Sequence, residues 1–216
     1  MKVALRIWLP LGLLAWVLMS CTTGPENPVF STFRHVIPLA EPVKPPFHPD
    51  PRFEYLRLVT GGRTLYLARG NWEDHHRVSV WYSASGEVLR FRDGRLVGAT
   101  GLFIEWRAVR LPTLPSWDEL ANQSIPYTWQ RERDVMPGYR YGVVDHLTLQ
   151  RVAPPTRSDL TGIPATSLIW FKETDGGAIP LPPAWYAWDP RSKEVLYGLV
   201  CLDATLCFSW QHWPVT

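Results

Sequence analysis

Strand-forming segments alternate with turn residues from Phe53 to the end of this 216-residue chain. Gly61-Gly62 separates the segment 54–60 from the segment 63–69, and Asp93-Gly94 separates a later pair in the same way. Glycine at such positions supplies the positive φ that two-residue hairpin turns need. Turn signals at intervals of roughly 8 to 12 residues are typical of antiparallel strands that pair in sequence order. The pattern restricts the chain to a β-meander.

About eleven short strands fit this pattern, and the only helical zone in the middle of the chain is Pro112 to Pro126. There Ser116 is followed by Glu119, which is the spacing of a capping box. We therefore predict an all-β, single domain of antiparallel meander strands forming a strongly curved sheet or open barrel, with one or two short helices. A strand over Leu102 to Val109 belongs to this prediction.

The N-terminus has the features of a bacterial lipoprotein signal. Lys2 and Arg6 give a positive start, an apolar run extends from Ile7 to Met19, and Ser20-Cys21 follows. A transmembrane anchor would need about 20 apolar residues, and this run is shorter. We predict cleavage before Cys21 and lipidation of Cys21 with acyl chains such as palmitate; an ordinary secretory signal is the alternative.

Three parts follow from this assignment: a signal peptide over residues 1–20, a lipidated proline-rich tether over 21–52, and a β domain over 53–216. Repeated prolines remove backbone donors and block helix formation, so the tether is expected to be extended or to lie over the domain surface. Thr22 stands where an aspartate retains enterobacterial lipoproteins in the inner membrane. The expected location is the outer membrane, lipid-anchored, on the periplasmic side.

The mature chain is expected to be electrically neutral. The full chain has 22 Lys and Arg against 20 Asp and Glu, and Lys2 and Arg6 leave with the signal peptide. A neutral body lacks the basic footprint of nucleic-acid binding. Membrane attachment is therefore expected through the lipid anchor.

Assigning Cys21 to lipid leaves Cys201 and Cys207 as a possible disulfide pair. If Asp203-Ala204-Thr205 forms a three-residue hairpin loop, the two cysteines lie opposite each other on one face, at the separation of a disulfide. A two-residue turn at 203–204 would separate them. Two buried free thiols are the alternative.

The chain has 12 tryptophans; Trp8 and Trp16 lie in the predicted signal peptide, and most of the others are expected in the core. Trp185, Tyr186 and Trp188 lie in a proline-flanked segment, so their rings could instead face a partner or a sugar. Asp145 falls on the apolar face of its strand and must either be paired with an Arg or Tyr or lie at an edge.

No pattern indicates catalysis, a metal or a cofactor. Glu73-Asp74-His75-His76 has the composition of a metal site, but adjacent side chains on a strand point to opposite faces. Neither a Gly-x-Ser-x-Gly elbow nor a phosphate loop occurs. We predict that the protein is not an enzyme; a glycan hydrolase or lyase would require convergent carboxylates in an open cleft.

The stretch from Trp81 to Leu102 reads WYSASGEVLRFRDGRLVGATGL. It resembles the hallmark of the YjbF/GfcB family of lipoproteins, in which a tryptophan or tyrosine strand and a glycine turn precede a Gly-Arg-Ile/Leu-Val…Thr-Gly-Leu strand. The resemblance is strongest over residues 78–106. Asp74-His75-His76 and the hairpin that carries Cys201 and Cys207 depart from the family pattern.

This resemblance implies a role in the secretion or assembly of an exopolysaccharide or group 4 capsule, beside an outer-membrane β-barrel partner and with no known catalytic residue. Arg95 in the motif becomes a candidate contact to the glycan or the partner, with Trp185, Tyr186 and Trp188. The alternative is a carrier of lipid or lipoprotein, similar to the localisation factors, whose curved sheet surrounds a large apolar cavity.

Overall fold

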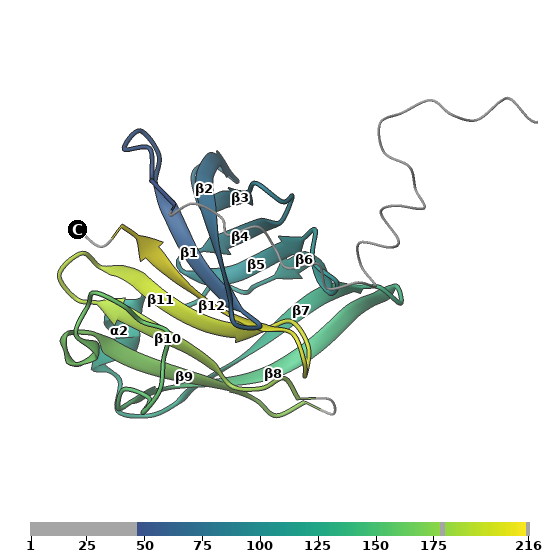
Figure 1. The fold of residues 1–216 in the computed structure, drawn as a ribbon. Coiled ribbons are helices and arrows are strands. Elements are labelled where there is room, and N and C mark those ends of the chain that lie inside the picture. The colour runs from purple at the N-terminus through teal and green to yellow at the C-terminus, as the bar shows by residue number, and fades with distance from the viewer. Residues whose placement is uncertain (1–46, 178–179, 215–216) are drawn as a thin grey trace, which may run out of the picture. The chain divides into compact units, whose positions relative to one another are not determined.

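The computed structural model describes residues 47–177 and 180–214 (Figure 1). The predicted signal peptide, the lipidation site Cys21 and most of the predicted tether therefore lie outside the described residues. In the part of the chain that is described, no helix is long and apolar enough to cross a membrane.

Twelve antiparallel strands of the described chain close into one barrel, in which each strand pairs with its neighbours in sequence and β1 pairs with β12 (Figure 1). The strands are β1 (Tyr55–Thr60), β2 (Arg63–Glu73), β3 (Val78–Ser83), β4 (Val88–Arg92), β5 (Arg95–Thr100), β6 (Glu105–Arg110), β7 (Tyr127–Met136), β8 (Arg140–Val152), β9 (Ile169–Asp175), β10 (Ala184–Asp189), β11 (Glu194–Cys201) and β12 (Cys207–Trp213). The predicted all-β meander is confirmed, and the barrel is closed by the pairing of its first and last strands.

The pairing between β5 and β6 is the shortest in the barrel, because its register contains a single residue pair, Ala99 and Trp106. Residues 102–104, predicted as strand, form a loop instead. Gly101 causes the break: it has φ +81°, and its N–H donates to the Glu105 carboxylate at 2.7 Å. This hydrogen bond bends the chain before β6 begins.

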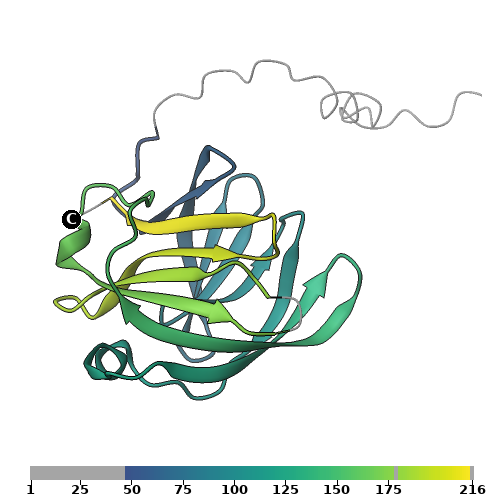
Figure 2. The same ribbon diagram turned by 90° about the horizontal axis from the view of Figure 1, so that it is seen from below.

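The helix α2 (Trp117–Asn122) lies between β6 and β7 and is visible as the teal helix in Figure 2. The predicted capping box is confirmed, because Ser116 Oγ accepts the Glu119 N–H at 3.2 Å and the Glu119 carboxylate accepts the Ser116 N–H at 2.7 Å. The Trp117 ring packs against Phe171 and Tyr186, with centroid distances of 5.1 and 5.3 Å. Helix α2 thus fixes an indole among the rings of β9 and β10.

Side chains fill the barrel interior. The largest fully buried ones are aromatic: Trp106, Trp188, Trp210, Tyr186, Phe171 and Phe208 belong to the main core. A second cluster around Trp170, Ala187 and Tyr197 covers the other face of the sheet beneath the chain between β8 and β9, which contains the 3-10 helix η1 (Ala165–Ser167). Strands β9 to β11 are consequently buried on both faces.

The described chain begins with an aromatic clamp on the barrel wall. Phe47 stacks on Tyr66 of β2 at a centroid distance of 4.0 Å and meets Tyr55 of β1 edge-on at 5.1 Å. The Asp50 N–H donates to the Tyr55 hydroxyl at 3.1 Å. Residues 47–50 of the predicted tether therefore lie over the surface of the β domain.

Cys201 and Cys207 are joined by a disulfide and lie directly opposite each other in the β11–β12 register. The Leu202 N–H donates to Leu206 O at 2.8 Å, which leaves a loop of three residues. Within this loop the Asp203 carboxylate accepts the N–H groups of Thr205 and Leu206, both at 2.7 Å. Of the two loop lengths considered, the three-residue loop is therefore present.

Gly94 combines a left-handed φ of +72° with a close approach to β11, where an added Cβ would lie 2.5 Å from Val195 Cβ. Gly61 has φ +54° and open space around it. Gly94→Ala and Gly61→Ala should each lose about 1–2 kcal/mol through the left-handed backbone, and Gly94→Ala should lose roughly 1–3 kcal/mol more through overpacking. Urea denaturation of both variants measures this difference; equal losses would contradict the described contact.

His212 lies against Trp81 and Trp210, at ring distances of 5.8 and 6.1 Å. Burial lowers the pKa of His212, and this effect outweighs the opposing effect of the nearby Glu54. The unfolded state therefore binds the proton more tightly, so the free energy of unfolding should fall as pH decreases below the ordinary histidine pKa of about 6.5. His212→Gln should flatten this slope. His75→Gln, at a residue whose side chain is 94% exposed, should leave it unchanged.

Candidate functional site

Strands β7 and β8 carry charged residues on faces that point into the barrel. On β7, Arg131 and Arg133 alternate with outward-facing residues and share their face with Trp129 and Val135. On β8, Asp145 lies opposite Arg131 in the register. The hairpin therefore places two guanidinium groups and one carboxylate in the core.

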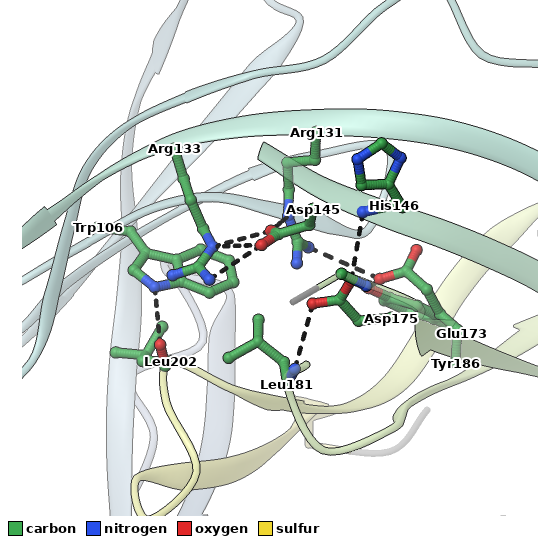
Figure 3. A network of polar contacts seen from close by, with 11 residues as sticks. Trp106, Arg131, Arg133, Asp145, His146, Glu173, Asp175, Leu181, Tyr186 and Leu202 are labelled. Atoms are coloured by element: carbon green, nitrogen blue, oxygen red, sulfur yellow. Dashed lines mark hydrogen bonds and ion pairs between the residues drawn. The ribbon is translucent and has the colours of Figure 1, made fainter. Parts of the chain in front are cut away.

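Asp145 binds both arginines (Figure 3). Arg131 Nε lies 2.8 Å from Asp145 Oδ2, and Arg133 donates to the same carboxylate through Nε at 2.8 Å and Nη2 at 2.9 Å. Arg131 Nη1 lies 3.6 Å from Glu173 Oε1 on β9. We call Arg131, Arg133, Asp145 and Glu173 the interior ion cluster; the exposed fraction of each side chain is at most 7%. Of the possibilities considered for Asp145, an Arg partner, a Tyr partner or an edge position, the arginine partner is present.

Trp106 of β6 forms one wall of the interior ion cluster. The guanidinium carbons of Arg131 and Arg133 lie 4.7 and 5.0 Å from its ring centroid, within the range of cation–π attraction. The Trp106 Nε1–H donates to Leu202 O at 3.0 Å. The cluster is thus coupled to the hairpin that the disulfide closes.

Glu173 is the least satisfied member. Tyr186 Oη lies 3.5 Å from Glu173 Oε1, and Glu173 Oε2 has no hydrogen-bond partner among the described residues. Burial raises the pKa of Glu173, although Arg131 and Arg95 act in the opposite direction, and burial also raises the pKa of Tyr186. The adjoining cavity offers about 10 Å³ to the centre of a water molecule, which is room for about one water.

The interior ion cluster therefore holds β7, β8 and β9 in register. The cavity beside Glu173 is therefore too small for a sugar or a peptide. The sequence reasoning missed Arg131, Arg133 and Glu173. Their signal was available, because the alternation along β7 places both arginines on the face of Trp129 and a hairpin centred on Gly138 places Arg131 opposite Asp145.

Three of the four predicted contact residues point inward, which corrects their expected role at the surface. Arg95 is 5% exposed, and its guanidinium carbon lies 3.9 Å from the Trp117 ring centroid. Burial lowers the pKa of Arg95. Tyr186 and Trp188 are fully buried core residues. Trp185 lies on the outer face, partly buried, with Lys172 Nζ 5.5 Å from its ring.

A groove with a volume of about 540 Å³ lies beside β7 where β6 ends. We call it the β7 groove; its lining residues are Arg110, Leu111, Pro112, Tyr127, Thr128, Trp129, Gln130, Arg131, Glu132 and Val144. The sequence reasoning missed this groove. The available signal was Pro112, directly after the last residues of the β6 segment.

The charges beside the β7 groove compensate one another. Arg110 lies 2.8 Å from Glu132 and 3.2 Å from Asp134. The Gly142 N–H, at 2.9 Å, and Arg110 hold the pKa of Asp134 below its usual range. Arg110 is therefore paired with both carboxylates, which gives the groove little net charge.

The segment Asp74-His75-His76 forms a left-handed turn, with φ values of 50°, 55° and 65°. Asp74 pairs with Arg77 and Arg92. Among the described residues, no group of three or more His, Cys, Asp or Glu side chains is arranged to hold a metal ion.

Asp145→Asn should destabilise the barrel by about 3–5 kcal/mol, because it leaves the buried Arg131 and Arg133 without a counter-charge. The matched control is Glu132→Gln, which removes a carboxylate from a half-exposed pair with Arg110 and should cost about 0–1 kcal/mol. Chemical denaturation of both variants provides the comparison. Similar losses would show that the buried cluster does not determine the stability of this hairpin.

Comparison with known proteins identifies a shared fold. Neither a protein family nor a curated protein matches the sequence. Among solved structures, the chain is similar to the hypothetical lipoprotein YmcC from Escherichia coli (K12), with a TM-score of 0.55 and 13% sequence identity. The match covers 76% of this chain and 85% of that chain. The described barrel thus has the fold of this structure.

Proposed function

We propose that this protein is an outer-membrane lipoprotein, anchored through Cys21 and facing the periplasm, that assists the secretion or assembly of an exopolysaccharide or capsule through a β-barrel partner. The observation that carries the proposal is a lipoprotein signal ending in Ser20-Cys21 ahead of a barrel. A solved structure with the same fold is itself described as a hypothetical lipoprotein. The export role rests on the resemblance of residues 81–102 to the YjbF/GfcB family.

The resembling segment forms β3, β4 and β5. Its Trp81 and Leu89 lie in the core, and Gly94 and Gly101 occupy turns that require glycine. The resemblance to the YjbF/GfcB family therefore rests on residues that build the barrel.

A filled interior favours an adaptor over a conduit or a carrier. The lipid-carrier alternative required a large apolar cavity, but aromatic side chains occupy the described interior and the cavity beside Glu173 has room for about one water. A glycan hydrolase would need a protonated carboxylic acid as general acid. Glu132 and Asp134 beside the groove are instead ion-paired with Arg110.

The anchor can be tested by fractionating membranes. Cys21→Ser should leave the membrane fraction without loss of folding, because the proposed lipid attachment is removed. Thr22→Asp should move the protein to the inner membrane, and Thr22→Ser, the matched control, should remain in the outer membrane. Cys21→Ser that stays in the membrane fraction would contradict lipid anchoring.

The export role needs a separate measurement. Deleting the gene should reduce surface polysaccharide, and the native protein should co-purify with an outer-membrane β-barrel from detergent-solubilised membranes. Expression of the full chain from a plasmid should restore both. Normal export in the deletion strain, together with a monomer from native membranes, would refute the proposed function.

A further inference from the structure

At its N-terminal end, strand β7 extends beyond its partner β6. The β6–β7 register runs from Glu105 opposite Met136 to Arg110 opposite Glu132 and stops there. The next residues are Leu111-Pro112-Thr113-Leu114-Pro115, and proline has no N–H to continue a ladder. Residues 127–131 of β7 therefore pair with β8 on one edge, while no strand of the described chain pairs with the other edge.

The direction of the backbone groups on this open edge follows from β8. His146 O accepts the Gly176 N–H at 2.8 Å, and the His146 N–H donates to Asp175 at 3.2 Å, so both groups face β9. Gln130 lies opposite His146. In an antiparallel ladder, such a pair directs the backbone groups of both residues away from each other. The N–H and C=O of Gln130, and by alternation those of Thr128, face the β7 groove.

These backbone groups are open to a ligand. No hydrogen bond joins the backbone of Thr128 or Gln130 to the chain that follows β6, within the part of the protein that is described. Both residues are exposed. An open strand edge of this kind is a template for another strand.

The β7 groove runs along this edge. Tyr127 and Trp129 line it from the inward face of β7, Thr128 and Gln130 line it from the outward face, and Leu111 lies after the end of β6. Side chains from both faces can line one groove only where it follows the edge of the strand, because successive side chains point to opposite sides.

We propose that the β7 groove binds an extended segment of a partner protein, which adds to residues 127–131 as a further strand. An extended peptide carries alternating N–H and C=O groups at the spacing of the open edge. Leu111, Tyr127 and Trp129 would contact apolar side chains on one face of the segment, and Gln130 with the Arg110–Glu132 pair would contact polar side chains on the other. The segment therefore alternates apolar and polar residues.

The groove is less suited to a glycan. Sugar rings bind by stacking on an accessible aromatic face, and Trp129 is only 8% exposed. Arg110 is already paired with two carboxylates, so it offers no free cation to an acidic sugar. The proposed strand addition goes beyond the export role and does not depend on it.

Hydrogen exchange tests the open edge in the lipidated full chain in detergent micelles. In the free protein, the amides of Thr128 and Gln130 should exchange faster than those of Trp129 and Arg131, which face β8. The probe is an acetylated and amidated heptapeptide of alternating valine and threonine with a lysine at each end. Adding it should slow exchange at Thr128 and Gln130. Slow exchange of both amides in the free chain would overturn the proposal.

A pair of substitutions at one residue separates backbone from side-chain recognition. Gln130→Pro removes the N–H that faces the groove, and the ring is tolerated because this N–H has no ladder partner. It should weaken binding of the heptapeptide about tenfold. Gln130→Ala removes the same side chain but keeps the backbone N–H, so it should weaken binding clearly less than Gln130→Pro does. Thr128→Pro is the second variant, used if Gln130→Pro fails to fold.

The alternatives give distinct results. The heptapeptide methylated at every second backbone nitrogen should not bind, because it cannot complete the ladder. Maltohexaose and tetragalacturonate are the glycan probes. If either one binds, and if Gln130→Ala weakens its binding while Gln130→Pro weakens it no further, the groove is a glycan site and the proposal is overturned. Concentration-dependent dimers that protect Thr128 and Gln130 would show that a second copy occupies the edge, which also overturns it. Peptide binding together with normal export in the deletion strain would refute only the proposed function.

Discussion

The arrangement of β7, β8 and β9 depends on the charges that the barrel encloses. Arg131 and Arg133 share the carboxylate of Asp145, and Arg131 also approaches Glu173, so three strands are joined by partners that can satisfy one another only in this register. A shift by one residue would turn these charges to the outside. Trp106 extends this constraint to β6 and, through Leu202, to the disulfide hairpin.

The same strands explain why one edge is open. The interior ion cluster keeps β7 aligned with β8 along its whole length, whereas β6 ends at Arg110 before Pro112. The β8 side holds Thr128 and Gln130 in extended conformation, although no described residue pairs with their backbone on the other side. The buried cluster and the β7 groove are thus two consequences of one long hairpin beside one short strand.

Local patterns in the sequence predicted the parts of the fold that are determined locally. Gly61-Gly62 and Asp93-Gly94 marked hairpins, and Ser116 with Glu119 marked the start of α2, because turns and caps depend on neighbouring residues. Closure of the barrel depends on β1 meeting β12, which no local pattern encodes. For Tyr186 and Trp188 the flanking prolines left a surface contact open beside the core. They belong to a strand whose inner face meets the core and whose outer face is covered by the distant chain between β8 and β9.

The aromatic clamp of Phe47 on Tyr66 and Tyr55 determines where a force applied to the N-terminus first acts on the barrel. In a protein held by its N-terminus, tension along the chain reaches this aromatic clamp and the Asp50–Tyr55 hydrogen bond before it reaches β1. Behind the clamp, β1 is bonded on both sides, to β2 and to β12. Force would therefore be shared as shear between two ladders, so the strand that closes the barrel is also protected against being peeled away.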